Sequence, residues 1–163
     1  MKLTDSSVLI GAAGEHYVLA ELIKRGVIAA KAPEGSPNMD IVTTDIEGNR
    51  LVALQVKTRR NKGSDKGWHM KAKHEAMVSE KLFYVFVDVG GQPTDPVQFY
   101  IVPSQIVAHV VRTSHAIWLR SPGRDGRAHN DSDMRRLKPA YGPYTSDDRE
   151  TREFASSYGN NSN

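Results

Sequence analysis

Four polar side chains have types and a spacing that suit phosphodiester chemistry. Gln55 and Lys57 are two residues apart in a strand-like run, so both project from one face of that strand. Asp40 precedes them in an SPNMDIV turn, and Glu15 interrupts the apolar stripe of the first helical segment. Carboxylate and amide oxygens are ligands for a hard cation, and a lysine ammonium suits a phosphate. The pattern predicts a metal site that cuts phosphodiester bonds.

The elements that must position these residues follow from caps, turns and hydrophobic periodicity. A helix is expected over residues 6–25, with N-cap side chains at Thr4–Ser7 and a stop at Gly26. Gly11 and Gly14 are costly inside a helix, so they suggest close approach to a neighbouring element. Strands are expected over residues 27–32, 40–46 and 51–59, the last two joined by a Gly-Asn turn.

The second half of the body is expected to complete a sheet covered by helices. Residues 82–89 form a nearly continuous apolar run, as in a central strand buried on both faces. A weakly amphipathic second helix is expected over 70–79, a strand over 98–102, a helix over 104–112 and a short edge strand over 116–119. From Ser121 the composition turns to Gly, Pro, Arg, Asp, Ser and Asn. We therefore expect a folded domain over 1–120 and an irregular extension over 121–163 with a disordered end.

With these elements placed, the chain resembles the PD-(D/E)XK nuclease superfamily over about residues 6–112. The resemblance implies an α/β, restriction-endonuclease-like core: a central mixed sheet flanked by helices in the order αβββαβ. It places the site on Glu15, Asp40, Gln55 and Lys57. Two departures are visible, because Pro37 stands three residues before Asp40 and Gln55 occupies the acid position, giving a Q-x-K variant.

The resemblance also implies roles for these residues. Asp40, the amide oxygen of Gln55, the carbonyl of Val56 and Glu15 would hold Mg²⁺, or Mn²⁺ in its place. Lys57 would orient the attacking water and stabilise charge on the phosphate. A glutamine at position 55 removes one negative charge, so weaker metal binding is expected. A structural salt bridge between Glu15 and Lys57 is the open alternative.

Positive charge is concentrated beside the proposed site. Residues 50–81 hold nine basic and three acidic residues, whereas the remaining chain holds thirteen basic and sixteen acidic ones. This asymmetry favours contact with a phosphate backbone, although a solvated lysine-rich loop would look the same. The expected nucleic-acid contacts are Arg59, Arg60, Lys62, Lys66, Trp68, Lys71 and Lys73, with Trp68 either stacking on a base or plugging the core beneath a loop.

Composition limits the other classes of function. The chain has no cysteine, which excludes disulfide scaffolds and thiolate zinc sites and fits a cytoplasmic compartment. The histidines, His74 among them, lack a supporting ligand pattern and are expected at the surface or in loops. No apolar run is long enough for a membrane span.

The expected function is a Mg²⁺-dependent endonuclease acting on nucleic acid, with double-stranded DNA the favoured partner. Whether cleavage needs a homodimer is open. Two alternatives stand beside it: a catalytically inactive nucleic-acid-binding module of the same fold, and a protein-interaction domain whose polar cluster is structural. Target specificity does not follow from these residues.

Overall fold

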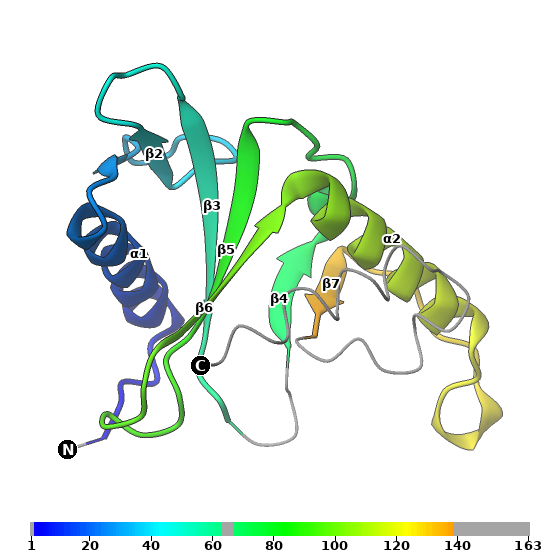
Figure 1. Ribbon diagram of the computed structural model, residues 1–163. Coiled ribbons are helices and arrows are strands. Elements are labelled where there is room, and N and C mark those ends of the chain that lie inside the picture. The colour runs from blue at the N-terminus through cyan, green and yellow to red at the C-terminus, as the bar shows by residue number, and fades with distance from the viewer. Residues whose placement is uncertain (1, 63–66, 139–163) are drawn as a thin grey trace.

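The computed structural model describes residues 2–62 and 67–138 (Figure 1). Its elements, in chain order, are α1 (Ser7–Lys24), β1 (Ile28–Lys31), β2 (Ile41–Thr44), β3 (Val52–Arg59), β4 (Trp68–Lys71), the 3₁₀ turn η1 (Ala72–Glu75), β5 (Leu82–Asp88), β6 (Gln98–Pro103), α2 (Ser104–Arg120), the 3₁₀ turn η2 (Arg124–Gly126) and β7 (Met134–Leu137). Strands β1, β2, β3, β5 and β6 form one sheet in that spatial order, and β4 pairs with β7 in a second, two-stranded sheet.

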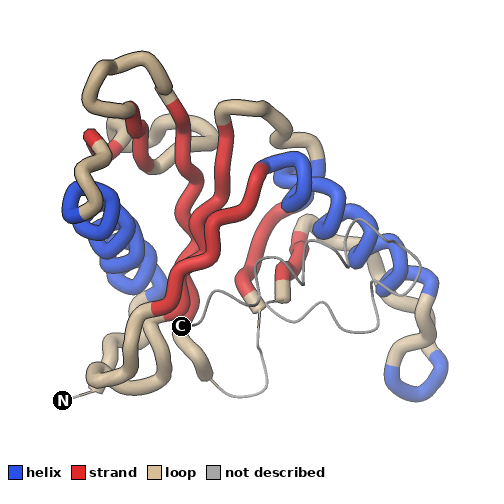
Figure 2. The backbone as a smooth tube through the Cα atoms, viewed as in Figure 1, coloured by secondary structure: helices blue, strands red, loops and turns tan. Residues whose placement is uncertain are grey.

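The strands of the large sheet lie side by side in Figure 2, where they are red, and the sheet is mixed because β3 and β5 form one parallel pair. β1, β2 and β3 form an antiparallel meander, β3 runs parallel to β5, and β6 returns antiparallel to β5. In the parallel pair Gln55 lies opposite Tyr84 and Lys57 opposite Phe86. β5 lies inside the sheet between β3 and β6 and is buried on both faces, which confirms the expectation drawn from its continuous apolar run.

Helices cover both faces of this sheet (Figure 1). On one face α1 packs over a core that includes Ile10, Val18, Leu54, Val56 and Val85. On the other face α2 and the β4–β7 pair enclose a second core that includes Trp68, Tyr84, Phe86, Val107 and Leu137. The fold class is therefore confirmed as mixed α/β with a central mixed sheet flanked by helices.

The helix and strand boundaries of the first half lie close to the expected ones. The Ser6 hydroxyl accepts a hydrogen bond from the Leu9 amide, which caps α1. Gly26 has a φ of +80°, a conformation that favours glycine and ends the helix before β1. Of the two helix glycines, only Gly14 sits against a neighbour, since a Cβ there would lie 1.8 Å from Thr58 Oγ1, whereas Gly11 faces open space.

Two secondary-structure expectations were wrong. The helix expected over 70–79 is instead strand β4 followed by one 3₁₀ turn, because Trp68 and Met70 alternate into the core and pair across to β7. The edge strand expected over 116–119 is the last turn of α2. There the aromatic ring of Trp118 stacks between His115 and His129, and this packing outweighs local strand propensity.

The expectation of an irregular extension from 121 was wrong for residues 134–137. These form β7, whose Leu137 is 3% exposed in the same core as Trp68. Residues 139–163, including the expected disordered end, lie outside the described residues. Among the described residues, no helix has the length and apolar character needed to cross a membrane.

Candidate active site

Asp40 stands at the entrance of β2 and is fixed by the neighbouring strand. Its backbone amide donates to the Leu54 carbonyl at 2.8 Å. Its carboxylate oxygen Oδ2 accepts a hydrogen bond from the Val56 amide at 2.6 Å and another from the side-chain amide of Gln55. Gln55 is itself 5% exposed. The structure thus brings together three residues expected at the metal site: Asp40, Gln55 and Val56.

Lys57 projects from β3 on the same face as Gln55, toward the side of the sheet that holds Tyr84, Phe86 and Trp68. Burial lowers the pKa of the Lys57 ammonium; Asp40 and Glu15 oppose that shift, whereas Lys73 adds to it. Burial raises the pKa of the Asp40 carboxyl, against the stabilising effects of the Val56 amide and the Lys57 charge. A half-buried acid and ammonium with shifted pKa values are typical of functional sites.

Glu15 approaches from α1, on the opposite side of the sheet, and is occupied by a different lysine. Its Oε2 lies 2.8 Å from the Nζ of Lys31 on β1. Glu15 still contributes to raising the pKa of Asp40, but no ion pair or hydrogen bond among the described residues joins it to Asp40 or Lys57. The salt bridge between helix and sheet therefore exists, but with Lys31 as the partner in place of Lys57.

The donor atoms around Asp40 suit a hard cation that takes only a few of its ligands from the protein and keeps water as the others. In residues 2–62 and 67–138 no group of three or more His, Asp and Glu side chains could hold a metal ion. The available donors are the Asp40 carboxylate, the Gln55 amide oxygen and the Val56 carbonyl, which are oxygen ligands of the kind Mg²⁺ takes. Because Mg²⁺ keeps several waters and needs only one or two carboxylates, this set fits, with weak affinity expected.

A second layer of polar residues, which the sequence did not predict, lies beside Lys57 at η1. The Nζ of Lys73 is 3.3 Å from Asn38 Oδ1, which ties η1 to the turn before Asp40. The Nδ1 of His74 lies 2.8 Å from the Tyr84 hydroxyl, and burial, with smaller effects of Lys57 and Lys73, lowers the pKa of His74 to about 4. His74 is 2% exposed, so its expected surface position was wrong.

Several expected nucleic-acid contacts are instead part of the fold. Trp68 is 1% exposed and donates its indole N–H to the Val87 carbonyl, so it cannot stack on a base. Arg59 lies over the Trp68 ring and pairs with Asp88 at 2.6 Å. Arg60 donates to Asp5 and to backbone carbonyls near the N-terminus. Lys62 also pairs with Asp5, but its side chain is 57% exposed, so its expected phosphate contact stays a prediction.

The remaining expected contacts have different outcomes. Lys71 and Lys73 are exposed, as a phosphate contact requires. Lys66 lies outside the described residues. Lys31, His74 and Tyr84 were missed because each meets its partner only in the folded chain: Lys31 pairs with Glu15 of α1, and His74 of η1 contacts the Tyr84 hydroxyl of β5. No local pattern in β1 or η1 indicates these contacts.

Two solved structures resemble this fold at low similarity. A bacterial homing endonuclease, I-Ssp6803I, is 18% identical over 64% of this chain and 70% of its own, with a TM-score of 0.45. Hjc, a Holliday junction resolvase of Archaeoglobus fulgidus, is 16% identical over 78% of this chain and 83% of its own, also with a TM-score of 0.45. No family model and no curated protein matches the chain.

Proposed function

We propose that the chain is a divalent-cation-dependent endonuclease whose substrate is nucleic acid, with double-stranded DNA the favoured form. The observation that carries this proposal is the Asp40 carboxylate, clamped by the Val56 amide and the Gln55 side chain, with Lys57 on the same strand face as Gln55. Asp40, Gln55 and Val56 would hold Mg²⁺, which would supply charge stabilisation and an activated water when bound.

Each protein residue then has a definite task. The β3 amide and the Gln55 side chain orient Asp40, so that its carboxylate is pre-positioned and need not reorganise during the reaction. Lys57 places an ammonium within electrostatic reach of Asp40, where it can bind a phosphate oxygen and stabilise the charge that develops there. Partial burial strengthens both interactions because the local dielectric is lower than that of water.

The test is cleavage of supercoiled plasmid by the full chain in Mg²⁺ or Mn²⁺, with EDTA as the metal-free control. Asp40→Asn and Lys57→Ala should each lower the cleavage rate by at least about 100-fold, the scale of losing one stabilising group in a phosphoryl-transfer site. Lys81→Ala is the matched control, since Lys81 is exposed in the same basic segment and is not among the groups that shift the pKa of Asp40. Full cleavage by the Asp40→Asn protein would refute the assignment.

A second candidate is a nucleic-acid-binding module without turnover. The observation favouring it is that the site has only one unpaired carboxylate: position 55 carries an amide, and Glu15 is neutralised by Lys31 at 2.8 Å. In this case the plasmid would be retained but not nicked in either metal. Restoring the acid by Gln55→Glu would then be expected to produce metal-dependent nicking, which a purely structural cluster would not show.

A further inference from the structure

The two-stranded sheet β4–β7 has one apolar and one polar face. Its strands alternate in register: Trp68 pairs with Leu137 and Met70 with Arg135, and all four are buried. The intervening pairs, His69 with Arg136 and Lys71 with Met134, are exposed. Since side chains alternate between the faces of a strand, the sheet presents an inner wall to the core and an outer wall to solvent.

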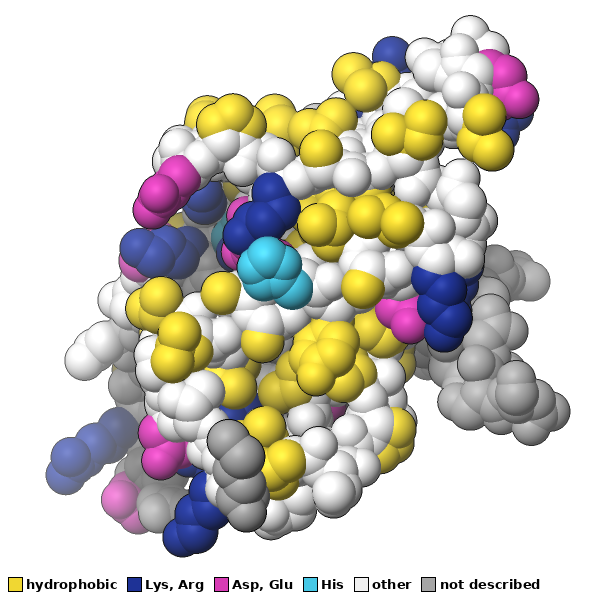
Figure 3. Space-filling view, turned by 90° about the vertical axis from the view of Figure 1, so that its left-hand side faces the viewer, with side chains coloured by type: hydrophobic (Ala, Val, Ile, Leu, Met, Phe, Trp, Pro, Cys, Tyr) yellow, Lys and Arg dark blue, Asp and Glu magenta, His cyan; other side chains and the backbone are white. Residues whose placement is uncertain are grey.

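The outer wall is basic. It carries His69, Lys71 and Arg136, and it is extended by Lys73 beyond β4 and by Lys138 beyond β7, all of them exposed. Among the described residues at this end of the sheet, Asp133 lies 3.7 Å from Lys71, and Asp131 is also exposed. The α1 helix carries the exposed apolar side chains Val8, Leu9 and Tyr17. On the face of the molecule that Figure 3 shows, apolar side chains are interspersed with lysine and arginine side chains.

This outer wall belongs to the same side of the large sheet as Lys57. Trp68 of β4 packs on Phe86 of β5 with ring centroids 5.2 Å apart, and Phe86 is the register partner of Lys57. Lys73 links the two regions: it contacts Asn38 near Asp40, and its charge contributes to lowering the pKa of Lys57. Lys73 therefore lies beside the candidate active site and only two residues beyond Lys71 of β4 in the chain.

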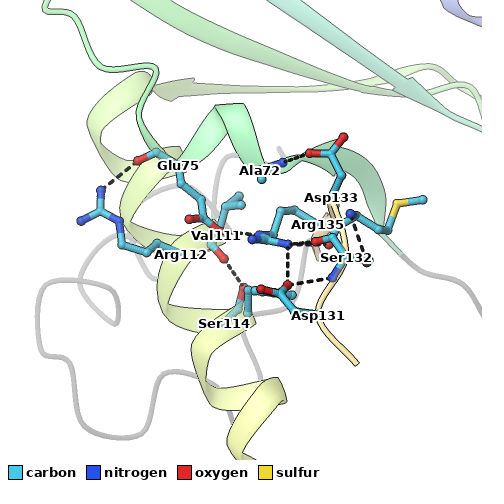
Figure 4. A network of polar contacts seen from close by, with 11 residues as sticks. Ala72, Glu75, Val111, Arg112, Ser114, Asp131, Ser132, Asp133 and Arg135 are labelled. Atoms are coloured by element: carbon cyan, nitrogen blue, oxygen red, sulfur yellow. Dashed lines mark hydrogen bonds and ion pairs between the residues drawn. The ribbon is translucent and has the colours of Figure 1, made fainter. Parts of the chain in front are cut away.

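A polar network centred on the buried Arg135 holds β7 in this position (Figure 4). Arg135, 8% exposed, donates to Glu75 of η1 and lies 3.6 Å from Asp131, while Arg112 of α2 donates to the Glu75 carbonyl at 2.9 Å. The Ala72 amide donates to the Asp133 backbone carbonyl at 2.9 Å. Arg136 also crosses Gly67 closely, since a Cβ at Gly67 would lie 2.6 Å from Arg136 Cγ. These contacts fix β7 against η1 and α2, and they thereby fix the side chains of the outer wall relative to the large sheet.

We propose that the outer wall of the β4–β7 sheet binds the phosphate backbone of double-stranded DNA and presents it to the Asp40–Lys57 site. This inference rests on the proposed function, because that function requires the bound duplex to extend toward Asp40 and Lys57. Arg59 and Trp68, which pack within the fold, are no longer proposed as DNA contacts. Arg136 and Lys138 are added; they belong to the segment that was expected to be an irregular extension. Contacts of this kind confer affinity and register without reading sequence.

The test is fluorescence anisotropy of a labelled duplex in EDTA, which separates binding from cleavage, over a range of salt concentrations. The outer-wall variant combines Lys71→Gln, Arg136→Gln and Lys138→Gln. The control variant combines Lys24→Gln, Arg50→Gln and Lys81→Gln, which are also exposed. Each lost phosphate contact should lower the slope of log affinity against log salt by about 0.9, or about eightfold in affinity at 0.1 M salt.

The outcomes separate this inference from the proposed function. The inference is supported if the slope of log affinity against log salt is shallower for the outer-wall variant and unchanged for the control variant, even if plasmid cleavage is absent. Equal binding by both variants overturns it, while metal-dependent cleavage would still stand. No retention of duplex by the wild-type chain at low salt overturns both. Arg136→Lys, which keeps the charge, should bind like the wild type, and thermal unfolding of every variant excludes misfolding as the cause.

Discussion

The two carboxylates near the candidate active site differ in what neutralises them. Glu15 is paired with a lysine ammonium, whereas the partners that hydrogen-bond Asp40 are neutral amides. Burial raises the pKa of the Asp40 carboxyl, whereas the Val56 amide, the Lys57 charge and the Gln55 amide lower it by stabilising the carboxylate. Of the two acids, Asp40 is therefore the better candidate for the proposed cation, because no lysine or arginine forms a salt bridge with it among the described residues.

At the same scale, His74 should make stability depend on pH. Its folded-state pKa of about 4 lies below the ordinary value of 6.5, so between these values the unfolded chain binds a proton that the folded chain does not. The free energy of unfolding should fall as pH drops through this window, by about 3 kcal/mol in total. Urea unfolding at a series of pH values measures this loss.

The matched variants isolate the imidazole. His74→Phe combined with Tyr84→Phe removes the titrating group and its hydroxyl partner together, and should flatten the pH dependence. Tyr84→Phe alone keeps the buried imidazole and should retain the slope. If both variants kept the wild-type slope, another group would be responsible for the acid sensitivity.

At the scale of the element, α1 and β3 are joined by close contact. Gly14 faces Thr58 at a distance that leaves no room for a side chain, and this contact fixes the helix that carries Glu15. Gly11, one turn earlier, faces open space and serves no such purpose. Two glycines in one helix thus have opposite roles.

This contrast gives a paired prediction for helix stability. Gly11→Ala should stabilise the fold by about 0.5–1 kcal/mol, because alanine loses less backbone entropy in a helix. Gly14→Ala gains the same helix propensity but must displace Thr58, so it should destabilise by about 1–3 kcal/mol, the cost of overpacking. Urea unfolding compares the two. Equal effects would mean that the α1–β3 approach is looser than described here.

The elements also show how far sequence reasoning reached. α1 and the five strands of the large sheet were predicted because each carries its own period, cap or turn. Gln55 and Lys57 were grouped because strand alternation is local, and Asp40 joined them through its turn position and the family resemblance. For Trp68, the alternative of a plug in the core is the one that the structure shows. β4 and the environment of Arg59 were not predicted, since they depend on pairing with residues 134–137 and on an ion pair with Asp88. Long-range partners leave no periodic trace in either segment.

At the scale of the whole molecule, one core spans the body and residues beyond 120. Leu137 packs with Trp68 and Met70 beneath α2, and the Arg135 network joins β7 to η1. The same four-residue strand therefore contributes both to stability on its inner face and to the proposed phosphate-binding wall on its outer face.

Substitutions on the two faces of β7 should separate these contributions. Leu137→Ala should lower the free energy of unfolding by about 2–5 kcal/mol, the range for truncating a buried leucine. Met134→Ala, on the same strand but 53% exposed, should change it by less than about 0.5 kcal/mol. Chemical denaturation provides both values. A Leu137→Ala protein as stable as the wild type would show that β7 does not dock in solution.

The pairing of His69 with Arg136 joins positions 67 residues apart in the chain. Closing so long a loop costs conformational entropy before any contact is gained, so this pair of strands is expected to assemble after the more local hairpin of β2 and β3. A newly made chain would consequently form the β1–β2–β3 meander first and the proposed DNA-binding outer wall last. Binding of the duplex would then require completed folding, and a chain in which β4 and β7 have not paired would neither bind the duplex nor position it at the candidate active site.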